Sequence, residues 1–422
     1  MSSKGKSSAE AGGRAGLVPK LRFPEFQAAP GWEYKRLASF LRDSSGRAPS
    51  TTTLPVFSST REGLRRQDAY FDGRILQNNN DYGVVPPGCF VYRHMSDDGT
   101  FKFNINDTGG EIAVSKEYPV FETVGLDSKF LLELLNEGDE FKHFAFSQKA
   151  GGTRTRLYFS KLCEWRTRLP TLPEQQKIAE CLDSADALAA AQGRKVETLT
   201  AHKKGLMQQL FPQEGETKPR LRFPEFEGAG EWEVRTIGEM FSLINGCAFK
   251  PEDWKTSGTP IIRIQNLNDP SAEFNYSQEP VPERKRVEPG DLLFAWSGTL
   301  GSSFGARIWN GPSGVLNQHI FKVLMDEQQV KLQFALLVLA RVEEEIARRT
   351  HGFKASFVHV KKSDLVKVEM LLPSPREQQR IADCLSSLDD LIAAEVRKLD
   401  TLKTHKKGLM QQLFPQVSEA GA

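Results

Sequence analysis

The sequence lacks the features that define several large classes of proteins. No stretch approaches the roughly 18 consecutive apolar residues of a membrane-spanning helix. Residues 1–18 are rich in Ser, Gly, Ala and Lys, and they lack the apolar segment of a secretory signal. The five cysteines are dispersed, with no Cys-x-x-Cys pair and no clustering with histidine, which favours reduced thiols over disulfides or a structural zinc site. We therefore expect a cytoplasmic protein, not bound to a membrane, that begins with a disordered tail.

Catalytic motifs are missing as well. Residues 5–7 (Gly-Lys-Ser) have no room before them for the first glycine of an ATPase phosphate loop. Residues 268–271 (Asn-Asp-Pro-Ser) lack the second proline and the aromatic residue of the loop with which amino-methyltransferases hold a base. Asp127 with residues 140–142 matches the carboxylates and lysine of a metal-dependent nuclease only loosely. The sequence therefore predicts no catalytic residue and no metal site.

The sequence does contain an internal repeat, which is the strongest organising signal in it. A strip at residues 19–36, PKLRFPEFQAAPGWEYKR, recurs at 219–236 as PRLRFPEFEGAGEWEVRT. Residues 173–213 and 376–416 begin PEQQKIAECL and REQQRIADCL, and both end in the same twelve residues, HKKGLMQQLFPQ. Between the copies lie a first module (37–170) and a second module (237–372), which share no obvious pattern. The copied parts are expected to share a geometric task and the modules to differ in theirs, unless the modules are one duplicated fold that merely drifted.

The two copied C-terminal stretches predict long helices. Apolar residues recur at spacings of mostly three and four, and polar residues interrupt the stripe at Gln192 and Lys203 in one copy and at Glu395 and Lys406 in the other. So narrow a seam is typical of a coiled coil. A helix over residues 174–210 would be about 55 Å long, and it could hardly bury its stripe alone. An antiparallel pair is the favoured interpretation, and burial of each helix on its own module is the alternative. The stripes are Ile178, Leu182, Ala185, Ala189, Val196, Leu199, Leu206 and Leu210, and then Ile381, Leu385, Leu388, Ile392, Leu399, Leu402, Leu409 and Leu413.

Both modules mix short β-rich runs with turn signals. Strands are expected within 82–92, 259–264, 291–296 and 319–324, and one helix per module at 128–137 and 330–348. The predicted fold class is α+β, with two globular modules separated by a pair of long antiparallel coiled-coil helices in an internal pseudo-two-fold repeat. The expected boundaries are a tail (1–18), a first domain (19–170), a helix (171–213), a linker (214–218), a second domain (219–372), a second helix (373–416) and a tail (417–422).

The net charge is only +2, but positively charged residues are concentrated in two segments. Two runs without acidic residues, 142–163 and 348–363, precede the copied helices at nearly corresponding places. Each holds glycine beside small polar residues, so each predicts a flexible basic loop suited to phosphates and, through arginine, to guanine edges. A merely solvated face is the alternative. The runs contain Lys142, Lys149, Arg154, Arg156 and Lys161, and Arg348, Arg349, Lys354, Lys361 and Lys362.

Weaker candidates follow predicted strands. Arg93, His94 and Ser96 do so in the first module, and residues 297–299 and 317–319 in the second, where the amides suit adenine. The complete set of predicted DNA-binding residues is Arg93, Lys149, Arg154, Arg156, Ser297, Thr299, Asn317, Gln318, Arg349, His351, Lys354 and Lys361.

The copied segments resemble a known family. Residues 21–26 and 221–226, both LRFPEF and each followed by Trp-Glu, resemble conserved strips of the specificity subunits of Type I restriction–modification systems. Residues 172–176 (LPEQQ) and 377–379 (EQQ) resemble the starts of that family's conserved helical regions, and KKGLMQQLFP resembles their ends. The resemblance covers residues 19–416, and residues 374–376 (Ser-Pro-Arg) depart from the pattern slightly.

This resemblance implies a non-catalytic subunit that binds double-stranded DNA. Two target recognition domains on an antiparallel helical spacer would each read one half of an asymmetric bipartite site. The chain would hold no cofactor itself. It would recruit two methyltransferase (modification) subunits that use S-adenosylmethionine, and then restriction subunits that use ATP and Mg²⁺. Two alternatives remain: a self-contained nuclease or methylase, and a coiled-coil protein-binding scaffold without direct base readout.

Overall fold

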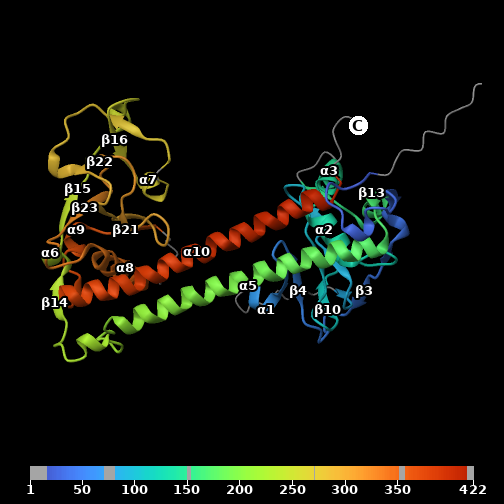
Figure 1. Cartoon of the computed structure of the whole chain (residues 1–422), viewed down its shortest axis with the longest axis horizontal. Coiled ribbons are helices and arrows are strands. Elements are labelled where there is room, and N and C mark those ends of the chain that lie inside the picture. Colours follow the sequence, from blue (N-terminus) through green and yellow to red (C-terminus); the bar gives the residue numbers. More distant parts are fainter. Residues whose placement is uncertain (1–16, 71–80, 150–153, 270, 351–356, 416–422) are drawn as a thin grey trace, which may run out of the picture. The chain divides into compact units, whose positions relative to one another are not determined.

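The computed structural model describes residues 17–70, 81–149, 154–269, 271–350 and 357–415. The chain forms two compact units (Figure 1): unit 1 comprises Met1–Gly193 with Lys398–Ala422, and unit 2 comprises Arg194–Arg397. The two longest helices are α5 (Leu172–Leu210) and α10 (Pro375–Leu413). Each unit therefore contains one module, the beginning of one long helix and the end of the other. None of the described helices combines the length and the apolar character needed to span a bilayer.

The two long helices were predicted almost to the residue. Pro173 and Pro375 lie in their first turns, where a missing N–H costs little. Every position of the predicted stripes is buried or half-buried, and most positions beside them are exposed. In unit 2, Lys195 pairs with Glu395 and Lys203 with Asp389. Because the numbers rise along one helix as they fall along the other, the two segments run antiparallel within that unit.

Only the first part of each long helix packs on the module that immediately precedes it in the chain. The start of α5 (Ile178 and Leu182) packs in the core of unit 1, and its end (Leu210, with Phe211 beyond it) packs in the core of unit 2. In α10 the order is reversed, because Ile381 lies in the core of unit 2 and Leu413 in that of unit 1. Each helix therefore begins on its own module and ends in the core of the other one.

Unit 1 contains short strands and short helices around a core rich in phenylalanine. One sheet has the order β2-β11-β7-β9, another has the order β10-β6-β3, and three two-stranded ribbons are β1·β13, β4·β5 and β8·β12. The elements are β1 (Glu33–Arg36), β2 (Leu41–Asp43), β3 (Gly46–Ala48), β4 (Phe57–Thr60), β5 (Gly63–Arg66), α1 (Gln67–Tyr70), β6 (Tyr82–Val85), β7 (Phe90–Tyr92), β8 (Met95–Ser96), β9 (Phe103–Ile105), β10 (Ile112–Ser115), β11 (Val120–Thr123), α2 (Ser128–Glu137), α3 (Asp139–Ser147), β12 (Thr155–Arg156), α4 (Phe159–Glu164) and β13 (Arg166–Leu169).

Unit 2 repeats most of this plan. Its sheet β15-β23-β19-β21 corresponds strand by strand to β2-β11-β7-β9, with every pair antiparallel in both, and β14·β25 and β20·β24 correspond to β1·β13 and β8·β12. A further sheet has the order β17-β16-β22-β18. The elements are β14 (Glu233–Thr236), α6 (Ile237–Met240), β15 (Ser242–Asn245), β16 (Thr259–Ile262), α7 (Ile264–Asn268), β17 (Asn275–Ser277), β18 (Arg286–Val287), β19 (Leu292–Ala295), β20 (Ser297–Thr299), β21 (Gly305–Ile308), β22 (Gly314–Leu316), β23 (Ile320–Leu324), α8 (Leu332–Thr350), β24 (Phe357–His359), α9 (Lys362–Leu365) and β25 (Glu369–Leu372).

The shared strand order relates the two modules to each other. Two segments without a common sequence pattern have one plan in their main sheet and in two of their ribbons, while their remaining sheets differ. The predicted β-rich run 82–92 does contain strands. The run 82–92 is broken at Pro86-Pro87-Gly88 into β6 and β7, which belong to different sheets, because proline lacks the N–H that a ladder needs. One local prediction was wrong, because the first module contains α3, an additional helix where a loop was expected.

Candidate nucleic-acid interface

The copied strips are fixed to the long helices by a buried ion pair. The Arg22 guanidinium donates to both carboxylate oxygens of Glu174, from Nε at 2.8 Å and from Nη2 at 2.7 Å, and the Trp32 indole donates to the same carboxylate at 3.3 Å. The side chain of Glu174 is 1% exposed. Its hydrogen bonds raise the pKa of Arg22, against the effect of burial. A two-pronged, buried pair of this kind sets the angle at which the strip leaves the helix.

Unit 2 repeats this arrangement with the copied residues. Arg222 donates to Glu377 twice at 2.7 Å, and Trp232 donates to Glu377 at 3.3 Å. The glutamine that follows each glutamate connects the long helix to its module: Gln175 accepts from the Asp127 amide before α2, and Gln378 accepts from the Lys331 amide before α8, both at 2.9 Å. The copied Glu-Gln pair therefore holds each module in the same way.

The first module presents a short antiparallel ribbon of β8 and β12. Thr155 pairs with Ser96 and Arg156 with Met95. The Leu157 amide continues the pairing by donating to the His94 carbonyl at 2.9 Å. The ribbon therefore brings together two candidate segments that are distant in the sequence, one after β7 and one from the basic run.

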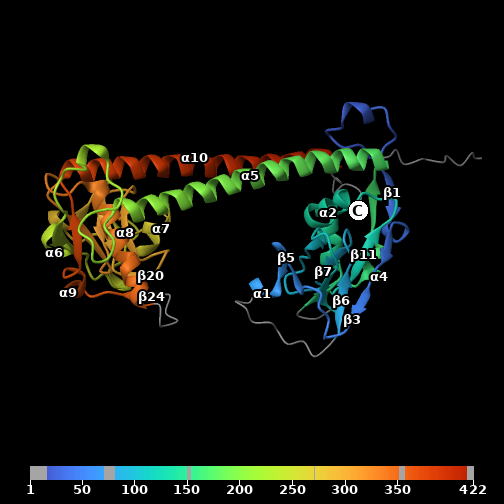
Figure 2. The same ribbon diagram turned by 90° about the horizontal axis from the view of Figure 1, so that it is seen from below.

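The second module presents the corresponding ribbon of β20 and β24, which lie side by side (Figure 2). Ser297 pairs with His359, and Thr299 with Phe357. The Val360 amide donates to the carbonyl of the residue before β20, Trp296, at 3.0 Å. Here too a segment that follows a core strand is joined to the predicted basic run.

Equivalent positions of the two ribbons follow from these closing hydrogen bonds, which make Leu157 and Val360 correspond. Counting from them, positions 154, 156 and 158 correspond to 357, 359 and 361. All six residues are exposed, and those between them are buried or half-buried, as the alternation of a strand requires. We call these the outer positions; they hold Arg154, Arg156 and Tyr158 in the first ribbon, and Phe357, His359 and Lys361 in the second.

Aromatic rings support both ribbons. His94 stacks on Tyr158 with ring centroids 5.6 Å apart, while Trp296 contacts His319 at 5.2 Å and His359 at 4.7 Å. Burial lowers the pKa of His94 and of His319 below the ordinary value of 6.5. Both imidazoles are therefore neutral at pH 7, with one donor and one acceptor nitrogen each.

The structure gathers most of the predicted residues of the first module at its ribbon. Arg93, Arg154 and Arg156 are exposed on it, and Arg154 forms an ion pair with Asp97 at 2.7 Å. Lys149 is exposed just after α3. The expected flexible loop was wrong for two other lysines of the basic run: Lys142 lies in α3 and Lys161 in α4, because the chain there forms helices.

The predicted residues of the second module are divided among several environments. Ser297 is only 4% exposed, and Thr299 is half-buried on β20. Lys361 is exposed at the last outer position, and Arg349 lies in the last turn of α8. His351 and Lys354 lie outside the described residues, as does part of the expected loop in the first module.

The predicted amide turn also reaches the second ribbon. The Trp296 amide donates to the His319 carbonyl at 3.2 Å, so the turn before β23 adjoins β20. Asn317 uses its side-chain oxygen to accept from the Gln318 amide at 2.8 Å, while the side chain of Gln318 is exposed. The side-chain nitrogen of Gln318 in turn lies 3.1 Å from Nε2 of His319, so both amides are engaged by a neighbour within the turn.

Several residues of the ribbons were not among the predicted DNA-binding residues. Tyr158, Phe357 and His359 occupy outer positions, and Trp296 supports the second ribbon. Residues alternate between inward and outward types in 357–361 (Phe-Val-His-Val-Lys) and 154–158 (Arg-Thr-Arg-Leu-Tyr). This alternation predicts strands, whereas the charge of the two runs predicts loops. Within the described residues, no group of His, Cys, Asp and Glu could hold a metal ion. The exposed side chains are suited to hydrogen bonding and charge pairing along a nucleic-acid groove.

Comparisons with known proteins show a family and a fold that this chain resembles. Residues 229–404 match the family described as the Type I restriction modification DNA specificity domain. The chain is 24% identical over 434 residues to the Type I restriction enzyme MjaVIII specificity subunit of Methanocaldococcus jannaschii, covering 93% of each chain. It is 27% identical over 159 residues to the Type I restriction enzyme EcoBI specificity subunit of Escherichia coli, covering 37% of this chain and 32% of that one. The crystal structure of the S subunit of a Type I restriction–modification system from M. genitalium has the same fold, with a TM-score of 0.55 and 15% identity over 95% of this chain and 100% of that one.

Proposed function

We propose that this chain, which belongs to the family of Type I restriction–modification specificity subunits, reads a bipartite double-stranded DNA site with two target recognition domains, one in each unit. As a specificity subunit it is the non-catalytic member of its complex. One observation carries the proposal: two modules with the same plan present equivalent ribbons whose outer side chains differ. Two similar readers with unlike surfaces suit a site made of two unlike halves.

The ribbons suit DNA in size and charge. The major groove admits a two-stranded β-ribbon, and arginine and lysine side chains beside it would contact phosphates and set the register. The net charge of +2 fits a reader that concentrates its cations locally. Other subunits would then supply further phosphate contacts around the duplex.

The long helices would act as an antiparallel coiled-coil spacer between the half-sites. Each helix has 39 residues, which is about 58 Å at 1.5 Å per residue. The support for this role is that each helix begins in the core of one unit and ends in the core of the other. Half-site spacing is a geometric property in other DNA readers also.

Two methyltransferase subunits would dock on the surfaces formed by the copied strips and the copied helices. Large apolar residues are exposed at matching positions of both copies, and exposed apolar surface marks sites for partners. One surface repeated twice suits two copies of one partner, which would bring S-adenosylmethionine; restriction subunits would bring ATP and Mg²⁺. The matched pairs are Leu21 (41% exposed) and Leu221 (40%), Tyr34 (57%) and Val234 (53%), and Leu188 (60%) and Leu391 (42%).

A module exchange tests DNA reading directly. Residues 37–170 are replaced by the corresponding module of another specificity subunit, and methylated motifs are mapped across the genome of cells that carry the complex. We expect one half of the motif to change while the other half and the spacing persist. An unchanged motif would contradict the proposal. Charge reversal at Arg154 and Arg156 separates a protein scaffold, which would keep its function, from a DNA reader.

Docking is tested by stoichiometry. Leu21→Glu and Leu221→Glu, introduced separately, should each leave one methyltransferase subunit per specificity subunit, and together should leave none. Native mass spectrometry measures the ratio, and each single variant serves as the control for the other. Two bound subunits in every variant would exclude these surfaces.

A further inference from the structure

The second outer position of each ribbon is occupied by a different side chain in the two modules. In the first ribbon this position holds Arg156, and in the second it holds His359. Each lies directly across from a residue of the partner strand, Met95 and Ser297 respectively. Position 156 therefore corresponds to position 359 in both its own strand and its cross-strand neighbour.

Arg156 is an exposed guanidinium with its donors available. No hydrogen bond or ion pair of its side chain is formed with the described part of the chain, and Met95 opposite it offers no acceptor group of strength. The neighbouring outer arginine is in a different state, because Arg154 donates to Asp97 at 2.7 Å. Of these two arginines, Arg156 is therefore the one whose guanidinium can donate two parallel hydrogen bonds to a ligand.

The carboxylates at the end of the first ribbon are paired with other arginines. Asp97 and Asp98 lie at the end of the same ribbon, and both are exposed. Hydrogen bonds from Thr100, Ser96 and Arg61 hold the pKa of Asp98 well below its usual range, so it is ionised. Asp97 is paired with Arg154 and Asp98 with Arg61, so neither carboxylate occupies Arg156, whose fork is left for the paired acceptors of a base edge.

His359 is held in place in the second ribbon. Its ring meets Trp296 edge to face at 4.7 Å between centroids, and its Nδ1 lies 3.4 Å from Ser297 Oγ. The ring is exposed even though these contacts restrict its rotation. A positioned imidazole offers a single directed hydrogen bond through Nε2, where an arginine offers two.

We propose that Arg156 reads a guanine in one half-site and that His359 is the base-reading residue at the equivalent place in the other. The guanidinium fork matches the O6 and N7 acceptors of guanine, while a lysine at the same place would supply charge without the fork. This inference rests on the proposed function and assigns the reading position within it. The difference between Arg156 and His359 is one physical source of the asymmetry between the half-sites.

The test uses the complete complex with its methyltransferase subunits. Complexes with wild-type chain, Arg156→Lys, Arg156→Ala or His359→Ala are bound to duplexes randomised across both half-sites, and bound DNA is sequenced. Arg156→Lys keeps the charge, so overall affinity should change little. The preference for guanine at one position of one half-site should nevertheless fall at least about fivefold, the lower bound for a lost bidentate contact. His359→Ala is the matched control, and it should alter only the other half-site.

A modified base gives the reciprocal measurement. Placing 7-deazaguanine at the affected position removes N7, so it should weaken binding by the wild-type complex severalfold and that of the Arg156→Lys complex hardly at all. Equal losses in the two complexes would overturn the assignment. So would a uniform loss of affinity in Arg156→Ala with all base preferences intact, which is the behaviour of a phosphate contact.

The remaining outcomes are equally distinct. Arg156→Lys indistinguishable from wild type, or a variant at 156 or 359 that changes both half-sites, would refute the equivalence of the two positions. A wild-type complex without any base preference would instead refute the proposed function. Melting temperatures and retention of the methyltransferase subunits show that each variant is folded.

Discussion

Replacing Arg22 with methionine isolates the ion pair that fixes the first copied strip to α5. Methionine keeps much of the apolar stem of arginine but removes its donors. In the variant the carboxylate of Glu174 would keep the Trp32 indole at 3.3 Å and lose the two shorter bonds from Arg22. The carbonyls of Ala29 and Pro30 would lose their donors at 2.8 and 2.9 Å as well.

The expected loss of stability follows from the burial of both partners. The side chains of Arg22 and Glu174 are 6% and 1% exposed, so solvent hardly screens their interaction. Removing one partner of such a pair costs about 3–5 kcal/mol, chiefly because a charge is left buried without compensation. Adding Glu174→Gln to Arg22→Met should recover part of that loss, because the remaining amide is neutral.

The chain carries its own control for this measurement. Arg222→Met breaks the copied pair with Glu377 in unit 2 and should cost a similar amount there. Hydrogen exchange followed by mass spectrometry assigns each loss to a unit, and urea unfolding gives its size. Faster exchange is expected in β1 and the start of α5 for Arg22→Met, and in β14 and the start of α10 for Arg222→Met.

Two results would refute this reasoning. A loss below about 1 kcal/mol for both single variants would place the pair among exposed salt bridges of little consequence. A double variant, Arg22→Met with Glu174→Gln, that is less stable than Arg22→Met alone would show that the stranded charge is not the source of the loss.

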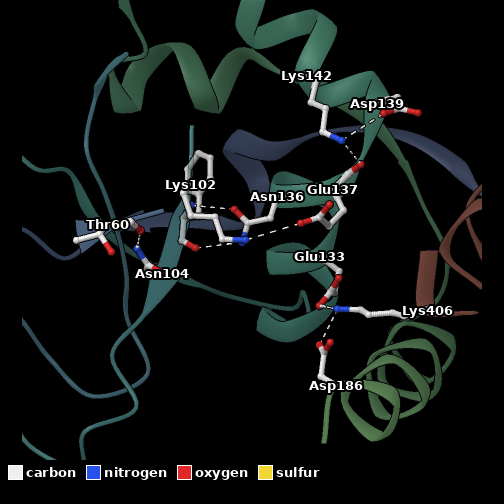
Figure 3. A network of polar contacts seen from close by, with 11 residues as sticks. Thr60, Lys102, Asn104, Glu133, Asn136, Glu137, Asp139, Lys142, Asp186 and Lys406 are labelled. Atoms are coloured by element: carbon white, nitrogen blue, oxygen red, sulfur yellow. Dashed lines mark hydrogen bonds and ion pairs between the residues drawn. The ribbon is translucent and has the colours of Figure 1, made fainter. Parts of the chain in front are cut away.

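Three further perturbations test other parts of the structure. Gly305 has φ +108°, and a Cβ there would meet Glu343 Oε1. Gly305→Ala should therefore destabilise unit 2 by at least about 2 kcal/mol in thermal unfolding. Adding Glu343→Ala to this variant should relieve the clash and leave the strain of the positive φ. Lys406 bridges Glu133 at 2.9 Å and Asp186 at 2.6 Å (Figure 3), and burial raises the pKa of Glu133 above its ordinary 4.5 against the pull of Lys406. A carboxyl group whose pKa is raised on folding gives stability that is complete below its unfolded pKa and is lost as the pH rises through its folded pKa. Lys406→Met should therefore steepen the fall in melting temperature as the pH rises from about 4 towards neutrality. Adding Glu133→Gln to that variant should abolish the steepening. Deleting one helical turn from both α5 and α10 should shorten the spacer of the methylated motif while both half-sites persist, and an unchanged spacer would contradict the role of the helices.

The copied parts of this protein were predictable because their signals are local. The stripe from Ile178 to Leu210 follows from a period of 3.6 residues, and the structure has helices where that period runs. The helix at 128–137 was likewise predicted by its own residues, with Asp127 as the cap that accepts from the Phe130 amide at 2.8 Å. Charge alone was a poorer guide, since Lys142 and Lys161 lie in helices and not in a loop.

The geometry of the reading surface could only be decided by tertiary structure. Arg156 became an outer residue because β12 pairs with β8, and His359 because β24 pairs with β20. Antiparallel pairing joins segments far apart in the chain, and its register sets which side chains face out; a shift by one residue would bury Arg156 and expose Leu157. The amino-acid sequence by itself determined the repeat and the helices, because periodicity is a property of neighbouring residues and copied segments can be matched letter by letter. Long-range hydrogen bonding decided which side chains the two ribbons present. Long-range apolar packing decided that α5 begins in the core of unit 1 and ends in that of unit 2, while α10 does the reverse.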